Sequence, residues 1–367
     1  MRPLSVLTAL TFAIGVAAHK ATTTPEEKAV EQALKEAIFR CTPEVSKFTL
    51  DRQKSWFGMV TGVGTQLPGY EDLFANQETL EGAEKKDDSS TFDLACTVSD
   101  TARNQQYPFY AVPSSNHFNH SCVLTPEVTE GPYYNNVTHP IRQNIAELQG
   151  GLLTYLDIGV IDVETCKPLP NVLVDIWHAN ATGHYSGHPV PAPEHVNEEP
   201  QVGGARAGLL SQYPRTKPEQ RFLRGAWATD STGVARFTTI FPGYYTGRAL
   251  HVHTKVWTEW EVLANGSFAP GKLSHTGQFF FEDEIGGEIV DKMHPYTENP
   301  IAHTRGRTRN WRDSLNVYGD SHGNGYNPVF DLHLLGGVLS QGVIGFITMG
   351  INASASYDNF WKGGVDS

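Results

Sequence analysis

Several features that commonly reveal a protein's function are missing from this chain of 367 residues. It has 28 lysine and arginine residues against 40 aspartate and glutamate residues, so the basic face that a nucleic-acid partner usually requires is not expected. No glycine-rich phosphate loop and no Gly-x-Ser-x-Gly sequence occurs, which argues against nucleotide chemistry and ordinary serine-esterase chemistry. The 4 cysteines show no Cys-x-x-Cys spacing, so a structural role is favoured over zinc binding.

The N-terminus predicts a secreted protein. Arg2 precedes an apolar run from Leu4 to Ala18 that ends in small residues, which is typical of a signal peptide over residues 1–18. The run is shorter than the ~20 residues that span a bilayer, so no membrane anchor is expected. In an oxidising compartment the even number of cysteines suggests two disulfides, with three pairings open among Cys41, Cys96, Cys122 and Cys166. Glycosylation sequons that support secretion begin at Asn119, Asn136, Asn180, Asn265 and Asn352.

Residues 19–118 predict an N-terminal helical and irregular arm. A helix is expected to begin at Thr24-Pro25-Glu26-Glu27, with a capping threonine, a proline in the first turn and acidic residues near the positive helix end. Apolar residues then recur at helical spacing up to Cys41. Residues 42–118 are polar and predict irregular structure. The arm is expected to pack on the main domain or on a second subunit, so a homodimer is one possible assembly.

From about residue 122 the pattern changes to strands. Short β-like segments separated by glycine and proline turns predict a mainly β protein, with a β-sandwich or barrel as its catalytic domain over residues 119–300. The expected strands cover residues 152–163, 172–177, 234–240, 250–257 and 278–282. Residues 301–367 form a C-terminal extension. Within it the apolar run 334–351 is interrupted by glycines and polar residues, which favours a buried strand pair packed on the core over a membrane span.

The strand over residues 250–257 carries the first candidate metal ligands. Side chains alternate along a strand, so His251 and His253 share one face, while Leu250 and Val252 share the other. Two imidazoles held in parallel on a rigid strand can form half of a metal site. Alone, however, this pair also fits two histidines on an exposed strand face.

Tyrosines near this strand change the interpretation. Phe241-Pro242-Gly243-Tyr244-Tyr245 forms a turn just before the histidines, and Tyr185 follows the strand that ends at Trp177. Neutral imidazoles combined with two hard anionic oxygens suit Fe(III) better than zinc or copper. A free tyrosine has a pKa of about 10, so the metal must displace its proton. The residues alone do not distinguish Tyr244 from Tyr245.

Three segments together resemble the intradiol ring-cleavage dioxygenases, and most of all their secreted fungal members, related to protocatechuate and catechol dioxygenases. These segments are GVIDVETCKPLPNVLVDIWHANATGHYS, TDSTGVARFTTIFPGYYTGRALHVH and HTGQFFFEDE, in that order. The resemblance covers roughly residues 122–295. It implies an Fe(III) site whose ligands are Tyr185, Tyr245, His251 and His253.

The resemblance also implies catalytic roles for Arg248, three residues before His251, and for Gln278 in the following strand. Arg248 would stabilise negative charge on the substrate, Gln278 would orient it, and Tyr245 would leave the metal and take up a substrate proton. The family usually reads Arg-Pro-Ala-His where this chain has Arg248-Ala249-Leu250-His251, and the bulkier leucine is expected to reshape the pocket wall. Residues from about 189 to 220 look like an insertion. Both departures concern the identity of the substrate.

The implied reaction is cleavage of a catechol-type diol between its two hydroxyls, with O2 as co-substrate and a muconate-type diacid as product. Catechol, protocatechuate, hydroxyquinol and larger phenolic diols all remain open as substrates. Two alternatives of other classes also remain. One is a secreted β-sandwich hydrolase that holds zinc with the same histidines, and the other is a non-catalytic binding module whose tyrosines form a surface platform.

Overall fold

The computed structural model describes most of the chain from residue 139 onward and a helical segment before it. The described residues are 39–61, 139–187, 219–299, 301–303, 306–323, 327–336 and 338–356, together with positions 25, 32, 36, 128, 130, 131, 133, 134 and 217. The predicted signal peptide, the predicted arm over residues 19–118 apart from 39–61 and positions 25, 32 and 36, and most of the 189–220 insertion lie outside these ranges.

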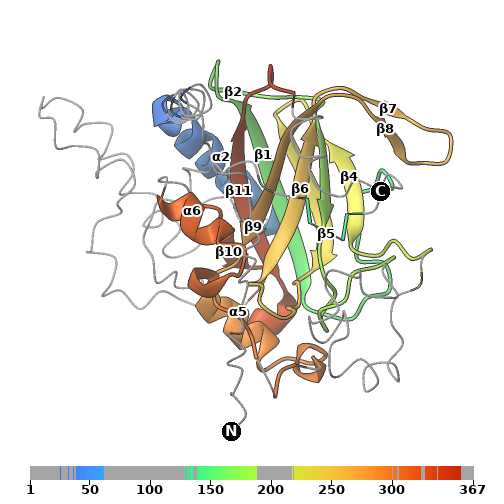
Figure 1. The fold of residues 1–367 in the computed structure, drawn as a ribbon. Helices are drawn as coiled ribbons and strands as arrows, with labels where there is room; N and C mark the ends of the chain where they lie inside the picture. The colour runs from blue at the N-terminus through green and yellow to red at the C-terminus, as the bar shows by residue number, and fades with distance from the viewer. Residues whose placement is uncertain are drawn as a thin grey trace, which may run out of the picture.

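Two β-sheets pack face to face (Figure 1). The first is built on β1 (Leu153–Asp162), which pairs in parallel with β11 (Val343–Ile351) along its full length. β10 (Asp331–Leu334) extends this sheet beyond β11, while β5 (Val234–Ile240) and β2 (Lys167–Pro168) pair antiparallel with the other edge of β1. A chain segment near the C-terminus therefore lies beside the first strand of the sandwich.

The second sheet is fully antiparallel and has the order β4-β3-β6-β9. Its strands are β4 (Arg224–Ala228), β3 (Leu173–Trp177), β6 (His251–Trp257) and β9 (Leu273–Phe280). A hairpin of β7 (Trp260–Val262) and β8 (Phe268–Pro270) projects between β6 and β9. After β9 the chain forms the short helix α5 (Asp283–Val290).

The main core lies between the two sheets. It buries alternate residues of the strands, as the period-two pattern predicts: Leu156, Ile158 and Val160 of β1, Val174 and Ile176 of β3, Val252 and Val256 of β6, and Ile347 and Met349 of β11. Burying apolar surface contributes roughly 25 cal/mol per Å², so this contiguous cluster provides the main stabilisation of the sandwich. The prediction of a mainly β sandwich is confirmed.

The predicted strands correspond to observed ones, with shifted ends. The strand expected over 234–240 is β5 itself, whereas the strand expected over 278–282 begins earlier, at Leu273, and ends at Phe280. The sequence did not predict β4 or α5. β4 is too short to show a clear alternation of apolar and polar residues, since Trp227 is its one large apolar residue. α5 carries two glycines, which disfavour a helix. Of the buried strand pair expected over 334–351, the structure forms one strand, β11, whose antiparallel partner β10 ends at Leu334, where the expected run begins.

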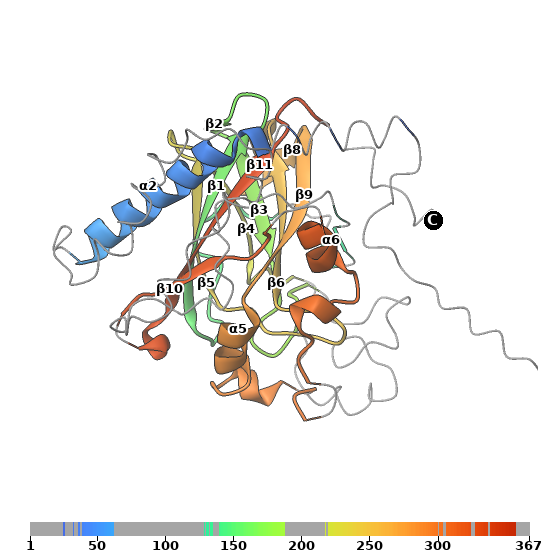
Figure 2. The ribbon, with the colours of Figure 1, turned by 90° about the vertical axis from the view of Figure 1, so that its left-hand side faces the viewer.

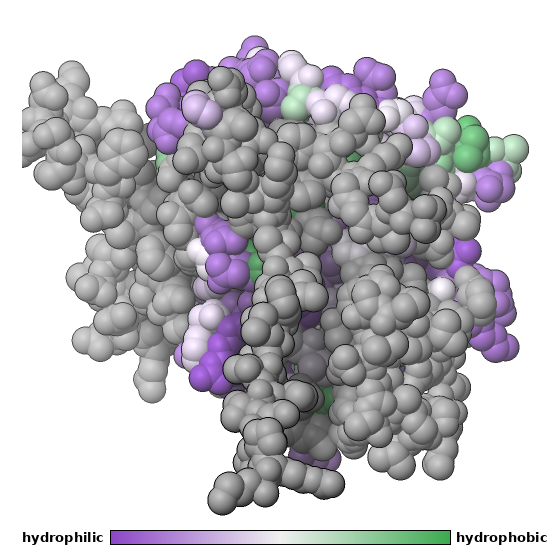
Figure 3. Space-filling model, in the orientation of Figure 1, coloured by the Kyte–Doolittle hydropathy of each residue, from purple (hydrophilic) through white to green (hydrophobic). Residues whose placement is uncertain are grey.

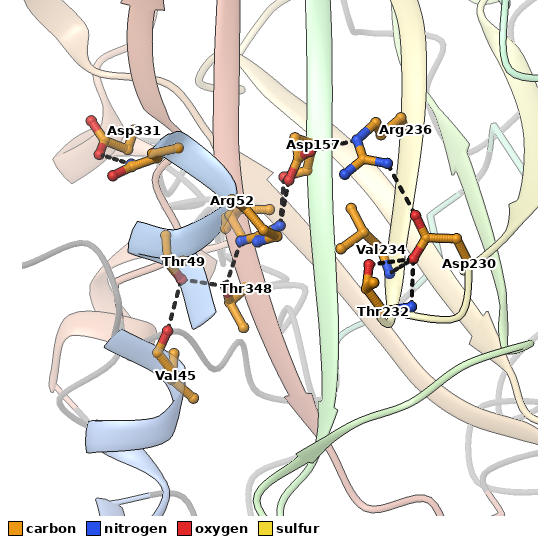
Figure 4. Close-up of polar contacts among 12 residues, drawn as sticks. Val45, Thr49, Arg52, Asp157, Asp230, Thr232, Val234, Arg236, Asp331 and Thr348 are labelled. Carbon is orange, nitrogen blue, oxygen red and sulfur yellow. Dashed lines mark hydrogen bonds and ion pairs between the residues drawn. The ribbon is translucent and has the colours of Figure 1, made fainter. Parts of the chain in front are cut away.

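The prediction of irregular structure directly after Cys41 is wrong for α2 (Thr42–Thr61), a helix that packs across β1 and β11 (Figure 2). Hydrophobic periodicity missed α2 because its packed face is largely polar. Thr49 hydrogen-bonds with Thr348 at 2.6 Å, and Arg52 donates to Thr348 at 2.7 Å and to Asp157 at 2.5 Å. Figure 4 shows Arg236 reaching the same Asp157 carboxylate, at 2.9 Å.

A disulfide fixes the start of this helix. Cys41 is bonded to Cys166 in the turn between β1 and β2, across a sequence separation of 125 residues. The pairing that sequence left open is thus decided for these two cysteines, while Cys96 and Cys122 lie outside the described residues. Gly159 lies under the helix, where a Cβ atom would come within 2.6 Å of Phe48 and 2.8 Å of Arg52. A residue without a side chain is therefore required on β1 at the crossing point.

The surface is mixed in character. In the view of Figure 3, apolar colour gathers at the upper right, over the β7–β8 hairpin, where Val262 is 68% exposed and Leu263 39% exposed. Of the helices in the described part of the chain, none combines the length and the hydropathy needed to cross a membrane.

Replacement of Arg52 by alanine should destabilise the fold, since it removes a guanidinium that Asp157 and Thr348 bind in a buried setting. Leaving a buried carboxylate with fewer partners typically costs several kcal/mol, and because Arg236 remains bound to Asp157 we expect a loss of about 2–3 kcal/mol. Urea unfolding of the two proteins measures it. Lys47→Ala, which breaks an exposed pair with Asp51, should cost less than about 0.5 kcal/mol. Equal losses for both variants would contradict the importance of the buried pair.

Candidate metal centre

The register of the four-stranded sheet brings side chains from all four strands into one row. Arg224 on β4 lies opposite Trp177 on β3, Trp177 lies opposite His253 on β6, and His253 lies opposite Gln278 on β9. Directly opposed residues of antiparallel strands point to the same face. The row therefore lies on one face of the sheet, and His251, two residues before His253, shares that face. As expected, the neighbouring Leu250 and Val252 point into the main core instead.

Two turns bring the tyrosines to this row. After β3, the turn at Asn180 packs directly against the Pro242-Gly243 turn, and the Gly243 N–H donates to the Asn180 carbonyl oxygen at 3.1 Å. Cβ atoms added to Gly183 and Gly243 would lie 2.2 Å and 2.3 Å from backbone oxygens of the opposite turn. Gly183 also has φ +88°, which favours glycine. The close approach of the two backbones requires these glycines.

Of the two adjacent tyrosines that sequence could not separate, Tyr245 is the one that joins the histidines. Its hydroxyl lies 3.4 Å from His251 Nε2, and its ring packs with those of Tyr133 and Tyr185. Tyr244 belongs to the main core, where burial, and then the charge of Asp291, raise its pKa to about 12. The alternation of side chains on extended chain sends neighbouring tyrosines to opposite sides.

Four donor atoms converge on one point of the interior. The Tyr185 hydroxyl lies 3.4 Å from His251 Nε2, as the Tyr245 hydroxyl does, and the Nε2 atoms of His251 and His253 are 3.1 Å apart. All four side chains are at least 96% buried. The four residues that sequence predicted as ligands, Tyr185, Tyr245, His251 and His253, are thus brought together.

The protonation of His251 leaves a lone pair directed at this point. Its Nδ1 lies 2.6 Å from the carbonyl oxygen of Ala249, which can only accept a hydrogen bond, so Nδ1 carries the proton and Nε2 is free to bind a metal. Burial, together with the charge of Arg248, lowers the pKa of His251 well below its ordinary value. Burial, followed by the nearby His251 and Arg248, does the same for His253. Both imidazoles are therefore neutral, as metal ligands must be.

Aromatic contacts hold these donors in place. The Trp177 ring stacks on His253 with a centroid distance of 4.8 Å, and Tyr133 stacks on Tyr185 at 4.6 Å. Burial, and then the neighbouring Tyr245, raise the pKa of the Tyr185 hydroxyl well above its ordinary value. Arg224 donates from Nε and Nη2 to Ser186, the residue after Tyr185, and so fixes the turn that carries it. The ligand candidates are pre-organised by their neighbours.

Arg248 and Gln278, predicted from the family motif, lie beside the donors. Arg248 Nη1 donates to the Tyr245 hydroxyl at 3.3 Å, and Nη2 donates to Gln278 Oε1. Sequence reasoning missed a third residue, Asp313, whose carboxylate accepts from Arg248 Nε at 3.0 Å. Burial lowers the pKa of Arg248, but Asp313 and the two tyrosines raise it by more, so that it lies above its ordinary value. No sequence motif marks Asp313, because it lies 65 residues beyond Arg248.

The two departures from the family motif have structural consequences. Ala249 donates its backbone N–H to Asp313 at 2.8 Å, a bond that the proline usual at this position could not make. The expectation that Leu250 reshapes the pocket wall is wrong, because its side chain faces away from the histidines. It belongs to the main core, where a Cβ atom added to Gly286 of α5 would lie 2.4 Å from it.

The donor set suits a hard trivalent metal. In the described part of the chain, no group of three or more histidine, cysteine, aspartate and glutamate side chains is arranged so that it could hold a metal ion. The oxygen donors beside the two imidazoles are the Tyr185 and Tyr245 hydroxyls. His253 Nδ1 and Gln278 Nε2 are buried and have no hydrogen-bond partner among the described residues. Nitrogen and phenolate oxygen ligands fit ferric iron.

Comparison with known proteins gave matches among solved structures only. No protein-family model matches the chain, and no curated protein matches it. An intradiol ring-cleavage dioxygenase from Tetranychus urticae is 29% identical over 65% of this chain and 98% of its own length, with a TM-score of 0.48. A second dioxygenase structure is 30% identical over 65% of this chain and 98% of its own length, with a TM-score of 0.47. The chain belongs to the intradiol ring-cleavage dioxygenases.

This intradiol dioxygenase assignment rests on residue identity across nearly the whole length of both relatives. A further match is the dioxygenase domain of a dioxygenase and carbohydrate-binding fusion from Streptomyces sp. SirexAA-E, which is 22% identical over 61% of this chain and 95% of its own length, with a TM-score of 0.34. The first of these structures is named as an intradiol ring-cleavage dioxygenase, and the other two are named as dioxygenases.

The iron-free dioxygenase should lose stability in acid, because His178 is buried and neutral. Its Nδ1 lies 2.8 Å from the Ala179 carbonyl oxygen and its Nε2 lies 2.8 Å from Thr239 Oγ1. Burial lowers the pKa of His178 from 6.5 to about 4. Between these values the unfolded chain binds a proton that the folded chain does not, so the free energy of unfolding falls as the pH falls.

The contribution of His178 is complete above about pH 6.5, and its loss by pH 4 amounts to up to about 3 kcal/mol. Urea unfolding between pH 7 and pH 4.5 measures the slope. His178→Gln cannot be protonated, so its unfolding free energy should depend less steeply on pH. An identical slope in the variant would count against this assignment.

Proposed function

We propose that this protein is an Fe(III)-dependent intradiol dioxygenase that cleaves catechol-type diols between the two hydroxyls and yields a muconate-type diacid. The observation that carries the proposal is the convergence of the Tyr185 and Tyr245 hydroxyls on His251 Nε2, at 3.4 Å each, beside His253 Nε2. Two neutral imidazoles and two phenols are an unusual donor set, and the family relationship supports a role for this set in ring cleavage.

The residues present fit a ferric ion. When two phenols bind as phenolates they offset two of its three charges, and the neutral imidazoles add ligands without adding charge. Ferric iron bound here would draw electron density from a coordinated diol and make its ring reactive toward O2. His251 Nδ1 keeps its proton and donates it in a hydrogen bond to the Ala249 carbonyl oxygen, which keeps Nε2 directed at the metal position.

We assign the labile position to Tyr245 and the permanent positions to Tyr185, His251 and His253. The Tyr245 hydroxyl lies within hydrogen-bond distance of the Arg248 guanidinium, with Nη1 donating to it at 3.3 Å, so this oxygen would keep a partner on leaving the metal. On arrival of the diol, the Tyr245 oxygen takes up a substrate proton and turns toward Arg248. The guanidinium then stabilises negative charge on the substrate, while Gln278, opposite His253 in the sheet register, helps to orient it.

We also propose that the protein acts outside the cell. The signal-like residues 1–18 support this proposal, as does the Cys41–Cys166 disulfide, since such bonds persist mainly in oxidising compartments. A secreted chain that begins after residue 18 would be the expected product in culture medium. Assembly as a homodimer through the helix expected over residues 24–41 stays a prediction.

Tyr185→Phe should abolish or shift the visible colour of the iron-loaded protein. Ferric tyrosinate absorbs visible light by charge transfer, whereas zinc is d¹⁰ and gives no such band. Tyr244→Phe is the matched control, because Tyr244 is buried in the main core and its loss leaves the donor set intact. Absorption spectra at equal iron content decide the matter. A colourless wild-type protein would favour the zinc hydrolase, and an unchanged spectrum in Tyr185→Phe would remove that residue from the ligand set.

Wild-type protein loaded with iron should consume one O2 per diol, and mass spectrometry should find both oxygen atoms in the diacid. A panel of catechol, protocatechuate, hydroxyquinol and a larger phenolic diol identifies the substrate. His251→Ala should lower iron content and reduce turnover by at least about 10³-fold, because the metal site loses a ligand. A non-catalytic binding module would instead bind its ligand equally well with and without His251.

A further inference from the structure

A segment far along the chain reaches the candidate site. Residues 310–315 begin with a 3-10 turn, Asn310–Arg312, whose Asn310 side chain donates to the Phe281 carbonyl at the end of the second sheet, at 2.8 Å. The Ser314 N–H donates to the Gly247 carbonyl at 2.8 Å, in the turn between Tyr245 and Arg248. These two bonds fix the backbone on both sides of Asp313. They direct its carboxylate into the protein, where the side chain has 0% exposure.

The Asp313 carboxylate binds both the Arg248 side chain and the backbone N–H of the next residue, Ala249. Oδ2 accepts from Arg248 Nε at 3.0 Å and from the Ala249 N–H at 2.8 Å, and Oδ1 accepts from Arg248 Nε at 3.2 Å and from the Leu315 N–H at 3.1 Å. Four hydrogen bonds leave this carboxylate a single orientation. Its position relative to His251, two residues beyond Ala249, is therefore set by the backbone itself.

Because the guanidinium of Arg248 is planar, its hydrogen bond to Asp313 also fixes the orientation of its other nitrogens. Its nitrogens form a rigid fork, so fixing two of them fixes the third. Asp313 holds Nε, Gln278 holds Nη2, and the remaining Nη1 points at the Tyr245 hydroxyl at 3.3 Å. A free arginine side chain would lose rotamer entropy in adopting this orientation, and Asp313 offsets that loss before any substrate arrives.

We propose that Asp313 is a positioning residue of this enzyme, which acts on the diol reaction through Arg248. It keeps the Arg248 guanidinium directed at the oxygen of Tyr245, and so at the place where the phenol leaves and substrate charge develops. This inference rests on the proposed function, in which Tyr245 is the labile ligand. The carboxylate also balances the charge of Arg248 in a buried setting, so the guanidinium remains in place when Tyr245 moves away.

The decisive experiment is a double-mutant cycle of Arg248→Ala and Asp313→Asn, measured on iron-loaded protein at equal iron content. A group misdirected by about 1 Å can cost about 10²-fold in rate, so Asp313→Asn should lower kcat/KM between about 10- and 100-fold. In the Arg248→Ala background the second substitution should add less than about 3-fold, because its target is gone. Losses that multiply would mean that Asp313 acts independently of Arg248 and would overturn the proposal.

Asp157→Asn is the matched control, since Asp157 is also a buried carboxylate that binds arginines but lies on the other sheet. It should lower stability and leave kcat/KM per folded molecule unchanged. Before any diol is added, the visible band of Asp313→Asn should move in the same direction as that of Arg248→Ala, because in both the Tyr245 oxygen loses a donor. An unmoved band would contradict the proposal.

A crystal structure of the iron-free Asp313→Asn variant tests the proposal without any measurement of activity. Arg248 should leave the Tyr245 hydroxyl, and an unmoved Arg248 would overturn the proposal whatever the enzyme does. If wild-type protein takes up no O2 with any diol, the proposed function fails instead. These two failures are distinguishable, because one concerns a side-chain position and the other the reaction.

Discussion

The register of the antiparallel sheet β4-β3-β6-β9 is the constraint on which the candidate site depends. One row across this sheet joins Arg224, Trp177, His253 and Gln278. The candidate ligand His253 therefore lies between the Trp177 ring on one neighbouring strand and the Gln278 amide on the other. A shift of one residue in any pairing would turn its side chain to the opposite face. The buried core on that opposite face, which includes Val174, Val252 and Phe279, excludes such a shift. Packing of the core on one face of the sheet therefore fixes which side chains lie at the candidate site on the other face.

Two further constraints complete the donor set. The first is the close backbone contact between the Gly183 and Gly243 turns, which sets the spacing of Tyr185 and Tyr245. The second is the carbonyl of Ala249, which orients His251 and decides its tautomer. Each is a main-chain interaction, and so depends on the path of the chain more than on side-chain identity. The resulting site is buried, and in such a setting charges and hydrogen bonds act more strongly than in water.

The sandwich receives support from outside its own strands. α2 lies across β1 and β11 and is joined to the β1–β2 turn by the Cys41–Cys166 disulfide. Its buried contacts are ionic and polar, with Arg52 between Asp157 and Thr348 (Figure 4). Such contacts stabilise only in a defined geometry, since an unpaired buried charge is costly. The helix therefore adds rigidity to the sheet that does not carry the histidines.

The sequence by itself determined the strand pattern, the placing of His251 and His253 on one strand face, and the tyrosines near them. These follow from local rules, because side chains alternate along a strand and turns need glycine and proline. Only the tertiary structure decided which adjacent tyrosine faces the histidines, where Leu250 packs, and how Cys41 pairs. It also revealed α2, whose packed face is polar, and Asp313, which reaches Arg248 from 65 residues away. Contacts of this kind produce no periodic pattern in the sequence, since they form between segments that meet only when the chain has folded.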